Sequence, residues 1–236
     1  MTAPDIGGHG SSALSAVSLN IVGPTVNTNV SGSTFVVCIA HENASTINTV
    51  TDNFGNTWVK QGSTYAGGTG ATFAQEIWMC VNGVGGTGLI VTAAQTPTNL
   101  GAMYFDEILN GDLTSPLDQN SGWTTDGATP FTQAVGPTTS AAEVLLAYAM
   151  TGSNSGTEVL TWGGTNVFTA LDAQGNANFF TGGSAKFLTS STGTYTASVT
   201  SAGAGTGAVN LIVLSFKAPS NVSEPDSLFF GSGTVN

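Results

Sequence analysis

Short runs of β-branched and aromatic residues recur along this chain of 236 residues, and Gly, Ser, Asn and Thr fill the segments between them. No apolar pattern with the 3.6-residue period of a helix continues for more than two turns. Such short strands, punctuated by Gly-rich turns, are typical of antiparallel β-sandwiches and barrels. We therefore predict an all-β fold, an antiparallel β-sandwich. The predicted strands are similar in the residue types that they contain, but no sequence repeat of fixed period is visible.

One tight turn has a clear local signature. It reads Asp52-Asn53-Phe54-Gly55-Asn56-Thr57-Trp58. Asp52 and Asn53 can bond their own backbone and Gly55 can adopt a positive φ angle, so the chain is expected to reverse here and to enter a strand at the anchor Trp58. The oxygen-rich side chains of Asp52, Asn53 and Asn56 also suit a weak calcium site. Because they include only one carboxylate, we favour the structural turn and predict no metal.

The composition argues against several partners. Only 7% of the residues are charged, against roughly 25% in typical domains. The hydration of the surface must therefore depend on hydroxyl and amide groups. The cations are Lys60, Lys186 and Lys217, with no arginine, and the net charge is −11. Binding to a phosphate backbone needs several basic contacts, so we expect no nucleic-acid partner and no attraction to anionic membranes. The apolar runs are much shorter than the ~20 residues that span a bilayer.

The candidate catalytic residues are few. A nucleophilic triad needs a histidine held by a carboxylate, but His9 lies in a Gly-rich segment without a scaffold and His41 closes a strand. Glu76 with Asp106 and Glu107 offers the best pair for glycoside hydrolysis. Adjacent strand residues point to opposite faces, however, so Asp106 and Glu107 cannot share one site. We predict that the protein is not an enzyme, with no catalytic residue and no cofactor.

The two cysteines, Cys38 and Cys80, both lie in apolar runs. They are expected to pack as small buried hydrophobic groups, and a disulfide between neighbouring strands is the alternative. No cluster of cysteine and histidine is present in the sequence, so no zinc site is expected.

The ends of the chain differ from its middle. We predict a sandwich domain over residues 18–217, an N-terminal arm over residues 1–17 and a C-terminal tail over residues 218–236. The N-terminal arm is rich in Gly, Ser and Ala and has little to bury. The tail carries Leu228-Phe229-Phe230, and free tails seldom expose adjacent aromatic residues. This cluster is predicted to dock on a partner's groove or sheet edge, or to fold back on its own sandwich.

Residues 110–130 form the longest segment without an obvious strand, and long loops often carry function. Trp123 in this segment is a candidate for stacking on a sugar ring. Asp112, Asp118 and Asp126 add an oxygen-rich patch beside it. We therefore predict that a ligand, if there is one, binds here.

The order of several features resembles a known module. In chain order these are the Asp52 to Trp58 turn, the strand Glu76 to Val81, the strand Leu89 to Thr92, the acidic strand Tyr104 to Glu107 and the last strand Val209 to Phe216. Over about residues 18–217 the chain resembles the jelly-roll-like β-sandwich module of bacteriophage virion proteins, which occurs in head decoration proteins, in tail-fibre or spike components and in some bacterial surface proteins.

This resemblance implies display, adhesion or capsid cementing, without catalysis. We expect a surface-exposed structural protein of a phage virion, made in the host cytoplasm because the first ten residues lack the features of a signal peptide. A head decoration or cement protein is the leading expectation. Its arms would anchor it to major capsid or tail subunits, as a homo-oligomer. The alternative is a tail-fibre adhesin that binds a receptor or a host-surface glycan.

Overall fold

The protein is described by a computed structural model, which covers residues 2–14, 16–66, 73–126, 129–151, 159–175, 180–202 and 209–219. Strands and turns make up these residues, with no helix among them. Nor does this part of the chain contain any helix that is long and apolar enough to cross a membrane. The predicted all-β class is confirmed.

The N-terminal half contributes eight strands, β1 (Asp5–Ala13), β2 (Ser18–Val22), β3 (Ser33–Glu42), β4 (Thr46–Asp52), β5 (Val59–Ala66), β6 (Phe73–Gly83), β7 (Val91–Asn99) and β8 (Gly101–Leu109). The C-terminal half contributes nine, β9 (Leu117–Asn120), β10 (Thr124–Asp126), β11 (Phe131–Val135), β12 (Glu143–Thr151), β13 (Val159–Gly163), β14 (Thr169–Gly175), β15 (Thr181–Leu188), β16 (Tyr195–Ala202) and β17 (Val209–Lys217). Every sheet is antiparallel.

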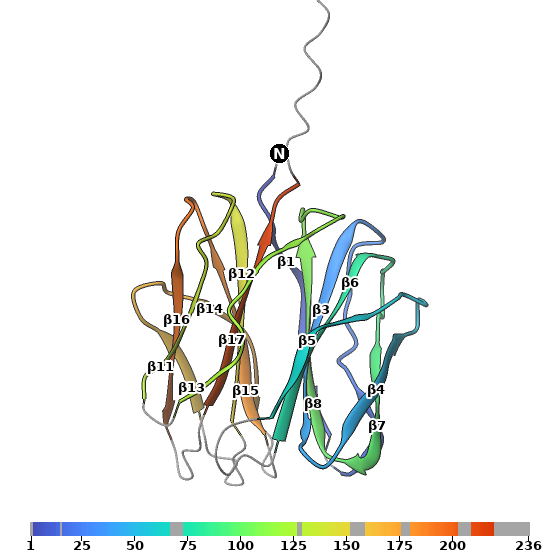
Figure 1. Cartoon of the computed structure of the whole chain (residues 1–236). Coiled ribbons are helices and arrows are strands. Elements are labelled where there is room, and N and C mark those ends of the chain that lie inside the picture. The colour runs from blue at the N-terminus through green and yellow to red at the C-terminus, as the bar shows by residue number, and fades with distance from the viewer. Residues whose placement is uncertain are drawn as a thin grey trace, which may run out of the picture.

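The strands form four sheets in two sandwiches that lie side by side (Figure 1). The N-terminal sandwich has an inner sheet in the order β1-β8-β3-β6-β5 and an outer sheet in the order β2-β7-β4. The C-terminal sandwich has an inner sheet β10-β17-β12-β15-β14, with β9 also on β17, and an outer sheet β11-β16-β13. The two inner sheets face each other, and we call their contact the joint.

The two sandwiches repeat one strand order. Adding nine to each strand number of the N-terminal sheets gives the C-terminal sheets. Counted from β1 and from β10, the first strand pairs with the eighth, the second with the seventh and the third with the sixth, which is the nested pairing of a jelly roll. The predicted β-sandwich therefore occurs twice, whereas the sequence led us to expect one sandwich over residues 18–217.

The predicted N-terminal arm and the predicted long loop both contain strands that the sequence did not indicate. Residues 5–13 of the predicted N-terminal arm form β1, which pairs with β8 and buries Ile6. In the predicted long loop, β9 and β10 follow one another along the same edge of β17. Main-chain hydrogen bonds to a strongly apolar partner strand hold these polar strands in place. Residues 220–236 of the predicted tail lie outside the described residues.

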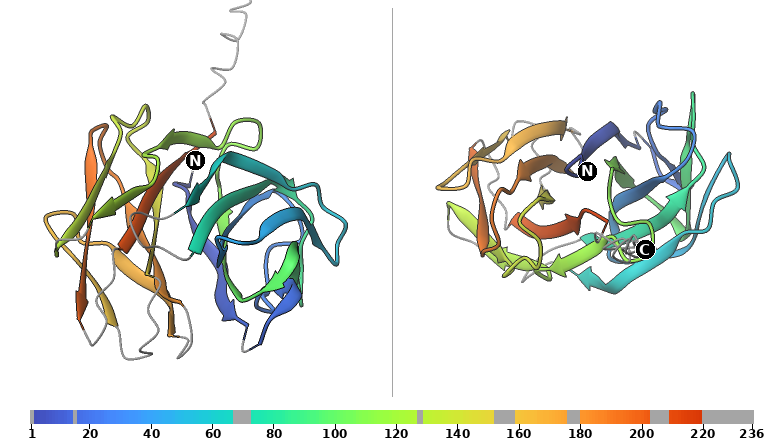
Figure 2. Two further views of the ribbon diagram at one scale, coloured as in Figure 1. Left: turned by 60° about the horizontal axis from the view of Figure 1, so that its bottom comes forward. Right: turned by 90° about the horizontal axis from the view of Figure 1, so that it is seen from above.

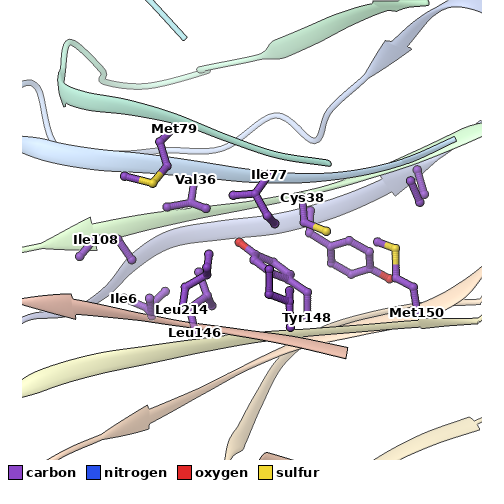
Figure 3. Close-up of a cluster of buried hydrophobic side chains, with 14 of the residues drawn as sticks. Ile6, Val36, Cys38, Ile77, Met79, Ile108, Leu146, Tyr148, Met150 and Leu214 are labelled. Carbon is purple, nitrogen blue, oxygen red and sulfur yellow. The ribbon is translucent and has the colours of Figure 1, made fainter. Parts of the chain in front are cut away.

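Three apolar cores separate the four layers. Along β3, Val36, Cys38 and Ala40 face the joint, while Phe35, Val37 and Ile39 face the core of the N-terminal sandwich. This alternation explains why the strand is apolar at every position. The joint core, shown in Figure 3, includes Val36, Cys38, Ile77, Ile108, Leu146, Tyr148 and Leu214.

The cysteines are placed on opposite faces of one sheet. Cys38 belongs to the joint core and Cys80 to the core of the N-terminal sandwich. Both are buried free thiols. The expectation of packed thiols fits this arrangement, and a disulfide between side chains on opposite faces is geometrically excluded.

The predicted turn joins β4 to β5. Asp52 Oδ1 accepts hydrogen bonds from the backbone N–H groups of Phe54 (2.9 Å) and Asn56 (3.2 Å), while Oδ2 accepts from Asn56 Nδ2 (2.9 Å) and Trp58 Nε1 (2.8 Å). Gly55 has a φ angle of 79°. Because N–H donors surround both carboxylate oxygens, Asp52 acts as the centre of the turn and not as a cation ligand.

A related turn recurs between β13 and β14. The carboxamide oxygens of Asn56 and Asn166 each accept a hydrogen bond of 2.8 Å from a backbone N–H of another segment. Two residues later in each case an aromatic ring, Trp58 or Phe168, is buried in the core of its own sandwich. This Asn-x-aromatic pattern is the local sequence trace of the structural repeat.

We expect Asp52→Ala to lower the free energy of unfolding by ~2–4 kcal/mol, because four hydrogen bonds to one carboxylate are lost. Urea unfolding followed by Trp58 fluorescence measures the change. Asp112→Ala, which removes a half-buried carboxylate bonded to the N–H groups of Thr114 and Ser115, is the control and should cost less than ~1 kcal/mol. Equal losses in the two variants would contradict a special role for Asp52.

Candidate functional site

The predicted ligand residues engage local partners. Asp112 accepts hydrogen bonds from backbone N–H groups two and three residues later, at 2.7 and 2.9 Å. Asp118 accepts from the backbone N–H of Thr139 at 2.8 Å. Asp126 ends β10 opposite Val209, and its side chain lies outside the description. Asp112 and Asp118 therefore serve first as turn and strand-end acceptors.

Trp123 packs between the two sandwiches. Its ring stacks on that of Tyr65, with the ring centroids 5.9 Å apart and 18° between the planes. Tyr65 lies on β5 of the N-terminal sandwich, while Trp123 immediately precedes β10 of the C-terminal one. The indole is half-buried against the joint core. One face of Trp123 is thus occupied by a protein ring and cannot stack on a sugar.

The carboxylate of Glu76 is saturated by donors. Oε1 lies 2.7 Å from Lys60 Nζ and accepts from Thr64 Oγ1 at 2.6 Å, and Oε2 accepts from Trp78 Nε1 at 2.8 Å. His41 Nε2 lies 3.8 Å from Oε1. Burial raises the pKa of Glu76, but the nearby imidazole of His41 and the bonds from Lys60, Thr64 and Trp78 outweigh it and lower the pKa from 4.5 to about 2. A carboxylate held in this way is suited to a structural role, in which it stabilises the fold.

Glu107 is held in a second network, away from Glu76. Its Oε1 accepts from the backbone N–H of Asn29 (2.8 Å) and from Ser33 Oγ (2.6 Å), and its Oε2 accepts from the N–H of Gly8 (2.8 Å). Glu107 pairs with Phe35 of β3 and Glu76 with Ile39. Four strand residues correspond to ~13 Å, more than the separation of a glycosidase pair. The geometry therefore gives no support to glycoside hydrolysis.

Five polar side chains gather in the joint, and we call them the joint ring. They are His9, Asp106, Tyr148, Asp172 and Ser184. His9 pairs with Asp106 across β1 and β8, and Ser184 of β15 pairs with both Tyr148 of β12 and Asp172 of β14. Directly paired residues share one face of a sheet. All five side chains therefore point into the joint.

Two hydrogen bonds across the joint close the ring. Tyr148 Oη donates to Asp106 Oδ2 at 2.8 Å, and His9 Nδ1 lies 2.8 Å from Asp172 Oδ2. The ring runs from a fully buried side to the edge of the joint, where the His9 side chain is 37% exposed and that of Asp172 is 18% exposed. Four of its five side chains, all except that of Ser184, are titratable.

Two buried atoms of the ring have no hydrogen-bond partner among the described residues, Asp106 Oδ1 and Ser184 Oγ. Both residues are fully buried. Burial raises the pKa of Asp106 from 3.8 to about 7, with a further rise from Asp172 and opposing effects from Tyr148 and His9. Asp106 therefore exchanges its proton near neutral pH, unlike an ordinary aspartate.

The joint ring contains the residue types of a catalytic triad without the access that catalysis needs. Ser184 is fully buried, so a substrate cannot reach its hydroxyl. The described residues contain no group of three or more His, Cys, Asp or Glu side chains that could hold a metal ion. The arrangement can bind, store and release protons between the two sandwiches.

Sequence reasoning missed this site because it placed His9 in an arm without a scaffold. The structure corrects this point, since β1 holds His9 beside Asp106. The one available signal was Asp106 itself, an acidic residue within the apolar run Met103 to Ile108. Asp172 and Ser184 lie in polar segments that give no sign of burial.

Comparison of this chain with protein-family models, with curated proteins and with solved structures found no match.

The Glu76 network predicts a pH-dependent stability. The folded-state pKa lies below the unfolded value, so its contribution is present above pH 4.5 and is lost as the pH falls through about 2. Wild type should exceed Glu76→Gln by ~3 kcal/mol in the free energy of unfolding at pH 7. Urea titrations between pH 2 and pH 7 measure this difference, with Glu42→Gln as control. A difference that is constant over this range would contradict the assignment.

Proposed function

We propose that this protein is a non-enzymatic structural protein of a phage virion, displayed on the particle surface and anchored by its two ends. The observation that carries this proposal is that both ends of the described chain meet the same segment. Asn110 Nδ2 donates to the carbonyl of Ala3 (3.4 Å), and the N–H of Asp112 donates to the carbonyl of Lys217 (2.9 Å). Figures 1 and 2 place the start of β1 and the end of β17 together at one end of the molecule, near the joint.

This arrangement divides the molecule into a terminal end and an opposite end. The strands run between the two ends, so the turn at residues 43–45 lies far from the segment 110–116. An anchor at the terminal end would leave the opposite end free in solution. A lattice repeats each anchoring contact many times, and weak identical contacts then add to firm attachment.

Among virion proteins we favour head decoration or cement, with the major capsid protein as partner and a homo-oligomeric state on the particle. These 236 residues contain no coiled-coil pattern and no sequence repeat that would form a shaft. Its charge-poor surface of hydroxyls and amides is compatible with exposure on a particle made in a host cytoplasm. For the alternative, a glycan-binding fibre adhesin, the face of Trp123 that stacks on Tyr65 is not available to a sugar ring.

The test compares bulky attachments at the two ends of the full chain. Thr114→Cys places a thiol in the exposed segment beside both ends of the described chain, and Ala44→Cys places one in the exposed turn at the opposite end. The native cysteines are buried, so a polymer maleimide modifies the new thiol. We expect the polymer at position 114 to abolish binding to particles stripped of this protein, and the polymer at position 44 to leave binding unchanged. Cosedimentation with the particles measures both.

The predicted tail anchor is tested in the same assay with the full-length variant Phe229→Ser/Phe230→Ser, which should bind at least tenfold more weakly if these rings are hot spots of the contact. Binding that is blocked from position 44, or unaffected by every change, would contradict anchoring at the terminal end.

A further inference from the structure

The joint combines an apolar core with charges that depend on pH. Among the described residues, the polar contacts that cross it include Tyr148 to Asp106, His9 to Asp172 and, at the edge, Lys186 Nζ to Asp5 Oδ1. The titratable groups that surround Asp106 come from every neighbouring element. They are Tyr104 on its own strand, His9 and Asp5 on β1, Cys38 on β3, Tyr148 on β12, Asp172 on β14 and Lys186 on β15.

The charge of the ring changes with proton uptake. With a proton on its carboxyl, Asp106 is neutral and adds no charge beside Asp172. Without that proton, Asp106 is an anion that faces the carboxylate of Asp172 on the opposite sheet, and the charge of Asp172 contributes to the raised pKa of Asp106. A charge on a fully buried carboxyl with a charge of the same sign near it is unfavourable. Separation of the sheets would return both carboxylates to water.

We propose that the joint ring is a proton-dependent latch between the two sandwiches, in which a proton on Asp106 holds the joint closed and its loss loosens it. The latch acts between two parts of one chain, so it does not depend on what the two ends of the protein bind.

The pH range follows from Asp106. The closed joint raises the pKa of this carboxyl from 3.8 to about 7. Its contribution to joint stability is therefore complete below pH 3.8 and is lost as the pH rises through about 7. From pH 6 to pH 8.5 this linkage increases the population of the open joint by about tenfold.

The two cysteines provide a built-in reporter. Cys38 is fully buried in the joint core, whereas Cys80 is buried in the core of the N-terminal sandwich on the other face of the same sheet. Opening of the joint exposes Cys38 alone. Unfolding of the N-terminal sandwich exposes both thiols.

The experiment labels the full chain with a maleimide at pH 6 and at pH 8.5. Each rate is divided by that of an unstructured cysteine peptide at the same pH, and mass spectrometry of the two cysteine peptides separates the sites. We expect the normalised rate of Cys38 to rise about tenfold, as the linkage of Asp106 requires, while that of Cys80 stays constant. Asp106→Asn should abolish the rise. Asp5→Asn, which removes the edge ion pair and leaves the ring intact, should retain it.

Three results would overturn the latch. Equal increases at both cysteines in wild type would show unfolding of the sandwich in place of opening of the joint. An unchanged normalised rate of Cys38 in wild type would show that opening of the joint does not depend on pH. This outcome is read from the wild-type protein alone, so it does not depend on whether a variant folds. A tenfold rise that persists in Asp106→Asn would assign the pH dependence to another group.

Discussion

Coverage of both faces of the two inner sheets is the constraint on which this structure depends. A strand buried on both sides must be apolar at successive positions, and β3, β8, β12 and β17 meet this requirement almost throughout. Each inner sheet then needs two covers. Its own outer sheet supplies one and the other inner sheet supplies the second, so neither half can bury its core without the other.

The same constraint explains where the polar residues of the joint lie. Partly exposed side chains meet at its two edges, with Tyr65 on Trp123 at one edge and His9 on Asp172 at the other. The edges of the two sheets approach there and water remains within reach. Asp106, Tyr148 and Ser184 are instead fully buried, and among the described residues the carboxyl of Asp106 accepts one side-chain hydrogen bond, from Tyr148. The protonation of a buried carboxyl with an unpartnered oxygen changes with pH, and the stability of the joint changes with it.

Local chemistry in the sequence predicted the strands and the Asp52 turn, because apolar runs and turn residues act over a few positions. The duplication was not predictable in this way, since strand order is set by contacts between distant residues. The Asn-x-aromatic sequence shared by Asn56 and Asn166 is too short to reveal it alone. β1 was missed because a strand of Gly and Ser is held by its backbone, and the joint ring was missed because His9 and Asp172 meet only after both sandwiches have folded.

The face-to-face packing of the inner sheets is tested most directly by nuclear Overhauser effects between aromatic rings of the full chain. The rings of Phe73 and Phe180 lie 5.8 Å apart across the joint, and those of Tyr104 and Tyr148 lie 6.2 Å apart. Within the separate sandwiches, Phe35 with Phe105 and Phe168 with Phe187 serve as references at 5.6 and 5.5 Å. We predict cross-peaks for all four pairs at pH 6. Cross-peaks for the two reference pairs alone would show that the inner sheets do not pack face to face.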